Sequence, residues 1–273
     1  MKIAYIAPIP ELEYTTRSDL HLVLPHVFKE PFGHRYKEHY RLCRSQGDYL
    51  ILDNGADEFG KATVRLPAIL GHARQMRAQE VVLPDVQQDG EATAAAVETA
   101  CEWLVTDAGK SAYQAAERPR FMLVPQGRSY DEWFDCFTRI YIATSGALSA
   151  IGVEPDRQLL VVGVAKNHDN KVLGGVTRLV YTLQHLNVDI HLLGWPKNSA
   201  SMRSVVDLDC VRSVDTARPF VYAMHGSTCA NINGHPNPYP GRGENYFRRA
   251  ITPALRSLVL KNMEYYEGQL TND

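Results

Sequence analysis

The stretch LLVVGVA at residues 159–165 is almost continuously apolar and rich in β-branched valine. An unbroken apolar run predicts a strand buried on both faces, as in a parallel sheet covered by helices, whereas alternation would predict one wet face. Six further runs of this kind lie at residues 3–8, 49–53, 81–86, 121–126, 190–195 and 211–216. The sequence therefore predicts seven buried strands.

Helical patterns lie between several of these strands, and each is long enough to return the chain to a parallel neighbour. They occupy residues 66–78, 91–106, 130–143, 176–186 and 199–207. This alternation predicts an α/β fold. Seven strands are one short of a closed barrel, and residues 220–224 are the candidate for the eighth or for a continuation of the seventh. We predict a single, irregular (β/α)8 TIM-type barrel, with an open doubly wound sheet as the alternative.

The chain has 273 residues and no internal repeat or linker, so we expect one domain over residues 1–273. Near its end, residues 230–243 (ANINGHPNPYPGRG) are rich in Asn, Pro and Gly and predict a long irregular loop. A final helix over about residues 252–270 carries apolar residues at helical spacing and is expected to pack outside the barrel.

Composition narrows the class of protein. The N-terminus MKIAYIAPIP does not have the pattern of a signal peptide, and no apolar run approaches the roughly 20 residues of a membrane span. The five cysteines form no CxxC pair, so a Cys-rich zinc site is not expected. A net charge of −2 argues against coating nucleic acid through bulk charge but leaves room for a local basic patch. We expect a cytoplasmic protein that has no membrane contact, metal or cofactor. The sequence leaves its oligomeric state open.

Polar residues follow five of the predicted strands at the same end. They are Asp53, Asp85, Gln126, Lys166 and Asp215. In a parallel barrel these strand ends open into one mouth, where active sites lie. Carboxylates there supply an acid and a base or nucleophile, and an amide recognises a planar ligand, which suits chemistry on the glycosidic bond of a base.

Structural roles compete with this interpretation at two of these positions. Asp53 precedes Asn54 and Gly55, a pair common in turns. Asp215 lies three residues before Arg218 and could pair with it. The simultaneous presence of polar residues at successive strand ends favours the functional interpretation.

Two further positions, Asp85 and Gln126, precede predicted helices. Asp89 is a better N-cap candidate than Asp85, which leaves Asp85 for the mouth. Ser129 is the expected cap of the helix that follows Gln126.

The order DNGA, PDV, PQG, GVA, LLGW, SVD over residues 49–218 resembles the tRNA-guanine transglycosylase superfamily. The likeness is nearest to its phage and bacterial branch, which puts 7-deazaguanines into DNA. The resemblance implies that Asp53 is a general acid/base and Asp215 the nucleophile that attacks C1′ of the nucleotide. Asp209, in DLDC, is a competing match for the nucleophile. The chain lacks the family's C-terminal zinc site, and this favours DNA over tRNA.

The same resemblance implies which residues bind the substrate. Asp85 and Gln126 correspond to the family's base-recognition groups, and Gly163 with Val164 corresponds to its Gly-apolar pair on the next strand. Lys166, directly after that strand, joins them as a substrate-binding candidate.

The implied partners are DNA, with its target nucleotide flipped out of the stack, and a free 7-deazaguanine base such as preQ0. Two basic patches are candidates for gripping the phosphates. The first contains Arg35 and Lys37, and the second contains Arg242, Arg248 and Arg249.

Three other functions compete with base exchange. A DNA glycosylase of the same fold would hydrolyse the bond to a modified base, as in defence against phage. A barrel that binds a nucleotide or a protein without chemistry belongs to a different class. A phosphate-metabolite enzyme ranks last, because the late strands lack a Gly-rich phosphate loop.

Overall fold

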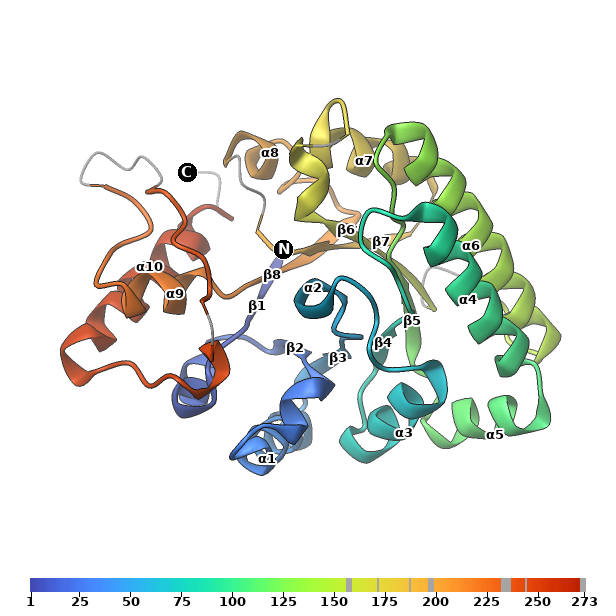
Figure 1. Ribbon diagram of the computed structural model, residues 1–273, viewed down its shortest axis with the longest axis horizontal. Coiled ribbons are helices and arrows are strands. Elements are labelled where there is room, and N and C mark those ends of the chain that lie inside the picture. Colours follow the sequence, from blue (N-terminus) through green and yellow to red (C-terminus); the bar gives the residue numbers. More distant parts are fainter. Residues whose placement is uncertain are drawn as a thin grey trace.

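The computed structural model describes residues 1–155, 159–170, 172–186, 188–195, 199–231, 237–243 and 245–270. Its strands are β1 (Lys2–Tyr5), β2 (Leu20–Val23), β3 (Tyr49–Leu52), β4 (Glu80–Val82), β5 (Arg120–Leu123), β6 (Leu160–Ala165), β7 (Asp189–Leu193) and β8 (Val211–Thr216). They pair in parallel in the order β1-β8-β7-β6-β5-β4-β3-β2, and β1 also lies against β2. The eight strands form a nearly closed barrel (Figure 1), which confirms the predicted TIM-type fold.

Helices lie around the strands, and the short helix after β3 lies over the barrel mouth instead of outside the barrel (Figure 1). They are α1 (Gly33–Ser45), α2 (Ala56–Phe59), α3 (Leu66–Met76), α4 (Gly90–Leu104), α5 (Asp107–Ala115), α6 (Tyr130–Ala150), α7 (Gly175–Leu183), α8 (Ser199–Arg203), α9 (Arg218–Met224) and α10 (Arg256–Gly268). The barrel is irregular at its start, because the 3-10 helix η1 (Ile9–Arg17) connects β1 to β2 in place of an α-helix. Helix α10 packs against α9 beside β1 and β8.

The eighth strand is not where we expected it. Residues 220–224 belong to α9, a buried helix with Pro219 in its first turn, where proline is tolerated because that N–H has no partner inside the helix. The missing strand is β2, whose sequence LHLV is only four residues long and contains a histidine. Its side chains are all buried, but the imidazole breaks the apolar pattern that revealed the other strands.

Two predicted helix caps are confirmed. The Asp89 side chain accepts a hydrogen bond from the Ala92 amide at 2.9 Å and begins α4. The Ser129 hydroxyl accepts one from the Glu132 amide at 3.2 Å and begins α6. Each cap satisfies an amide that the helix itself leaves without a partner. The loop after β4 therefore ends at Asp89 and the loop after β5 ends at Ser129. Asp85 and Gln126 precede these caps and lie at the mouth.

The helices have no membrane-spanning character. Within the described ranges, none combines the length and the apolar composition that crossing a bilayer requires.

Candidate functional site

The turn after β3 fixes Asp53 at the barrel mouth. The Asp53 amide donates to the Val23 carbonyl at 2.9 Å, and its carboxylate Oδ2 accepts from the Gly55 amide at 2.9 Å. Gly55 has a φ of 83°, a left-handed conformation that glycine adopts without strain. The tight turn that the Asn-Gly pair suggested is therefore present, and it is what orients the carboxyl group of Asp53.

Burial dominates the electrostatics of Asp53. Its side chain is buried, and loss of solvent raises its pKa well above the usual range of a carboxyl group. The negative charges of Glu58, Asp85 and Asp215 act in the same direction, while the Gly55 N–H opposes them. These surroundings favour the protonated form, which can donate a proton.

Asn54, Asp85 and Gln126 form one buried polar chain across the ends of β3, β4 and β5. Asn54 Nδ2 donates to the Leu83 carbonyl at 2.6 Å and to Asp85 Oδ1 at 2.7 Å. Gln126 Nε2 donates to Asp85 Oδ2 at 2.7 Å, and Gln126 Oε1 accepts from the Gln88 amide at 3.0 Å. Burial raises the pKa of Asp85 to about 6, although both amide donors lower it. Asp85 and Gln126 therefore hold each other in a rigid wall of the mouth.

Asp215 comes from the end of β8. Its Oδ1 accepts a hydrogen bond from the Gly194 amide at 2.8 Å and lies 3.3 Å from His191 Nε2 on β7. The structural pairing of Asp215 with Arg218 does not form, because the Arg218 guanidinium donates to the Trp195 carbonyl at 3.0 Å. Asp209 precedes β8, at the barrel end opposite to the mouth, so Asp215 is the residue of the two that reaches the site.

Two cavities meet at this mouth. A small one, of about 60 Å³, is lined by Asp53, Asp85, Gln126, Lys166 and Asp215 among others. A larger one, of about 580 Å³, is lined by Lys166, Trp195, Asp215, Arg218, Tyr239 and Tyr266 among others. Asp215 and Lys166 border both cavities, so a ligand in the larger one would lie directly against Asp215.

Two cations lie at the border between the cavities. Lys166 Nζ is 3.5 Å from Asp57 Oδ2. The Arg242 guanidinium binds Asp57 at 2.7 Å and Glu58 at 2.8 Å, and this ties the loop before α10 to helix α2. Arg242 is thus engaged by two carboxylates of the chain itself, which differs from its predicted role in holding a DNA phosphate.

Gly163 and Val164 do not line either cavity of the mouth. Both lie on β6 and are buried, and a side chain at position 163 would meet Leu193, Met122 and Val124 within 3.0 Å. Neither residue lines the mouth, so their predicted contact with a ligand is not seen in the geometry.

The remaining basic residues of the two predicted patches lie on α1 and on the C-terminal segment. Arg35 is exposed on α1 and Lys37 is half-buried there. Arg248 is paired with Glu30 at 2.6 Å, and Arg249 is exposed on the C-terminal segment.

Sequence reasoning missed His191. It interrupts the apolar run at residues 190–195, where a polar side chain on a buried strand needs a partner. The ring is fully buried, with Nδ1 2.8 Å from Ser213 Oγ and Nε2 facing Asp215. The signal was present in the sequence, but it identifies the partner only when the neighbouring strand is known.

Comparison with known proteins supports the fold. No family model matches the chain, and no curated protein matches it significantly. A D-psicose 3-epimerase solved in the presence of D-fructose shares 11% identity over 98% of both chains, with a TM-score of 0.51. A D-psicose 3-epimerase from Clostridium cellulolyticum H10 with D-tagatose has 11% identity over 98% of both chains and a TM-score of 0.49. A D-tagatose 3-epimerase-like protein has 12% identity over 80% of this chain and 90% of its own, with a TM-score of 0.41.

These findings correct the predicted family and function. The D-psicose 3-epimerase with a TM-score of 0.51 shares the fold, and no family model supports the tRNA-guanine transglycosylase superfamily. The pentosyltransferase and DNA glycosylase activities are therefore wrong, as are DNA and a free 7-deazaguanine as partners. The physical reason is that the motifs are short. Polar turns after buried strands arise in any (β/α)8 barrel, because all of its strand ends open into one mouth.

Proposed function

We propose that this protein is an enzyme that moves a proton on a small polyhydroxylated substrate, with Asp53 as the acid and Asp215 as the base. The observation that carries the proposal is that both carboxyl groups line the same small cavity. Among the described residues, each uses one oxygen in a hydrogen bond to the protein, Asp53 through Oδ2 and Asp215 through Oδ1. The second oxygen of each remains for a ligand.

The two groups suit complementary roles. Asp53 is buried so that its protonated form is favoured, and a protonated carboxyl next to a substrate oxygen is a general acid. Asp215 is held through Oδ1 by the Gly194 amide, and the residue lines the cavity. A pair of carboxyl groups in different surroundings is a common arrangement for acid and base chemistry.

The reaction that uses such a pair is proton transfer next to a carbonyl group. Asp215 takes the proton from the carbon beside the carbonyl, while Asp53 gives its proton to the carbonyl oxygen, and an enediol forms. The carbonyl re-forms when a hydroxyl of the enediol gives its proton back to Asp53. Asp215 returns its own proton to the neighbouring carbon, which exchanges aldose for ketose. Alternatively, Asp215 loses its proton to water while a water proton reaches the original carbon from the other face and inverts it. Lys166 lies at the border of the cavity, where its charge would stabilise the oxygen that becomes negative.

The larger cavity supports a sugar-sized substrate. Its volume of about 580 Å³ lies in the range of small-molecule sites. Trp195 and Tyr266 pack edge to face with ring centroids 4.5 Å apart and provide an apolar wall, while Arg218 and Asn237 provide polar groups. Sugars present C–H faces and hydroxyl groups together. The D-psicose 3-epimerase with the same fold was solved in the presence of D-fructose, and this is consistent with the proposal.

The test is exchange of carbon-bound hydrogen in D2O. The protein would be incubated with a panel of ketohexoses, ketopentoses and aldoses, and proton NMR would follow loss of the signal beside the carbonyl and appearance of an epimer or isomer. We expect exchange with at least one sugar, lost in Asp53→Asn and in Asp215→Asn and kept in Asp209→Asn.

The same panel measures binding by calorimetry. Binding of a sugar without any exchange would indicate that the protein is a non-catalytic binding barrel and not an enzyme. Absence of both binding and exchange across the panel would contradict a sugar substrate.

A further inference from the structure

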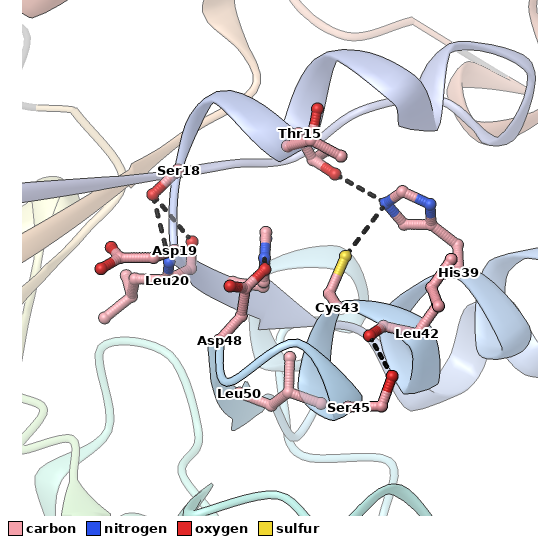
Figure 2. A network of polar contacts seen from close by, with 12 residues as sticks. Thr15, Ser18, Asp19, Leu20, His39, Leu42, Cys43, Ser45, Asp48 and Leu50 are labelled. Atoms are coloured by element: carbon pink, nitrogen blue, oxygen red, sulfur yellow. Dashed lines mark hydrogen bonds and ion pairs between the residues drawn. The ribbon is translucent and has the colours of Figure 1, made fainter.

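A second group of reactive side chains lies at the opposite end of the barrel from the mouth. His21 is on β2, Cys43 is in the last turn of α1, and Asp48 immediately precedes β3. One ligand atom from each lies within 4.8 Å of the other two. Figure 2 shows Cys43 and Asp48 in this region, with His39 one helical turn before Cys43.

The three residues lie next to one another, and Cys43 Sγ also lies 3.6 Å from His39 Nε2. His21 Nε2 lies 2.9 Å from Asp48 Oδ2. The His21 ring is fully buried, and its Nδ1 has no hydrogen-bond partner among the described residues. An imidazole kept in the core with one nitrogen unsatisfied is costly, and a hydrophobic residue would avoid that cost.

We propose that His21, Cys43 and Asp48 bind a zinc ion at the N-terminal end of the barrel strands. A thiolate, an imidazole and a carboxylate are ligands that zinc accepts together, whereas calcium and magnesium prefer oxygen alone. Zinc bonds of about 2.0 to 2.3 Å at tetrahedral angles put ligand atoms about 3.3 to 3.8 Å apart. The ligand atoms of the group lie within 4.8 Å of one another, so shifts of about 1 Å in the side chains reach this spacing, and a water molecule takes the fourth position.

Protons balance in this binding step. The imidazole of His21 binds the metal through the lone pair of a ring nitrogen, and Cys43 binds it as a thiolate. The Cys43–Zn bond forms as the S–H bond breaks, and one proton passes to solvent for each ion bound.

The site has a route to solvent. Asp48 lines a surface groove of about 720 Å³, together with Lys2, Arg17 and Asp19 among others. Its side chain is 20% exposed, in contrast to the fully buried ring of His21. A hydrated ion can therefore meet Asp48 first and then bind the two inner ligands. By joining β2, α1 and the start of β3, the ion would also stabilise the part of the barrel where no α-helix follows β1.

The test uses cobalt as a spectroscopic substitute for zinc. Untagged protein is stripped with a chelator, returned to buffer and titrated with Co²⁺. We expect one Co²⁺ per chain, with the intense visible bands of tetrahedral cobalt and a thiolate-to-metal charge-transfer band in the near ultraviolet. Zn²⁺ should displace the cobalt and raise the melting temperature.

Cys43→Ser should remove the charge-transfer band and weaken binding more than about 100-fold, since loss of even an outer-shell partner costs 10 to 100-fold.

The control is Cys101→Ser, which removes another buried cysteine, on α4, and should leave the spectrum unchanged. Asp48→Asn is the second variant. Because the Asp48 side chain is partly exposed, this variant should fold even if Cys43→Ser does not. Substoichiometric binding, or a charge-transfer band that survives in Cys43→Ser, would overturn the proposal. A spectrum of six-coordinate cobalt without charge transfer would overturn it as well.

Discussion

The Gly194 amide donates a hydrogen bond of 2.8 Å to Asp215 Oδ1, and this contact links the end of β7 to the carboxyl group on β8. The second oxygen of Asp215 takes no part in this contact, and the residue lines both cavities of the mouth. Asp215→Asn keeps a carbonyl oxygen that can accept from Gly194, but it removes the ability to take a proton. We therefore expect proton exchange to fall at least about 100-fold, while the free energy of unfolding changes by less than about 1 kcal/mol.

The control for this substitution is Asp209→Asn, which makes the same chemical change on an exposed residue before β8. Exchange is measured by NMR in D2O and stability by urea unfolding. Equal loss of exchange in both variants would contradict the role of Asp215.

The turn that holds Asp53 depends on Gly55. A Cβ atom at this position would lie 2.9 Å from Thr63 Oγ1, in addition to the strain of a φ of 83°. Gly60, at the other end of α2, has a φ of 74° with nothing within 4 Å of its Cβ position. Gly55→Ala and Gly60→Ala both cost about 1 kcal/mol of backbone strain, and Gly55→Ala costs more because Thr63 must move.

Urea unfolding compares these two variants. Only Gly55→Ala should also reduce activity, since Oδ2 of Asp53 is bound to the Gly55 amide. If both variants lose the same stability and the same activity, the contact with Thr63 has no role.

Asp85 makes stability depend on pH. Its pKa is raised from 3.8 to about 6 in the folded protein, so the folded state holds this proton more tightly than the unfolded chain does. Its stabilising contribution is full below about pH 4 and is lost as the pH rises through about 6. Two pH units correspond to roughly 3 kcal/mol of unfolding free energy.

The measurement compares the protein with Asp85→Asn in urea at pH 4, 5, 6 and 7. The difference in unfolding free energy between the two should shift by roughly 3 kcal/mol over this range, in the sense that Asp85 stabilises less at higher pH. A difference that does not vary with pH would mean that the amides of Asn54 and Gln126 keep Asp85 ionised throughout.

Much of the fold was predictable because buried parallel strands are continuous apolar runs. The run at residues 159–165 corresponds to β6 almost residue for residue. The strand ends also placed Asp53, Asp85, Gln126 and Asp215 around one mouth, where the structure has them. Strand β2 was missed because a four-residue segment with a buried histidine gives no periodic signal.

The partners of the site residues were not predictable in the same way. The contact of Asp85 with Gln126 joins positions 41 apart in the chain, and that of Asp215 with His191 joins positions 24 apart. Both depend on strand register, which a single sequence does not contain. The short motifs also suggested a family that the comparisons contradict, because turns at strand ends reflect barrel geometry before they reflect chemistry.

The far end of the barrel holds a buried ion pair whose removal should be costly. Glu80 on β4 is fully buried, and its carboxylate accepts from Arg212 Nη2 at 2.5 and 2.6 Å and from the Tyr49 hydroxyl at 2.9 Å. Glu80→Gln leaves the Arg212 charge without its partner in a site that is mostly desolvated. We expect a loss of about 3 kcal/mol in unfolding free energy.

The matched control for that loss is Glu38→Gln on α1. Glu38 pairs with Arg41 at 3.2 Å, and both side chains are more than half exposed, so solvent screens their attraction. This variant should cost less than about 1 kcal/mol, because water replaces the lost partner. Chemical unfolding at neutral pH measures both variants. Equal costs would show that Arg212 regains solvent or another acceptor when Glu80 is neutralised, and that burial does not set the strength of this pair.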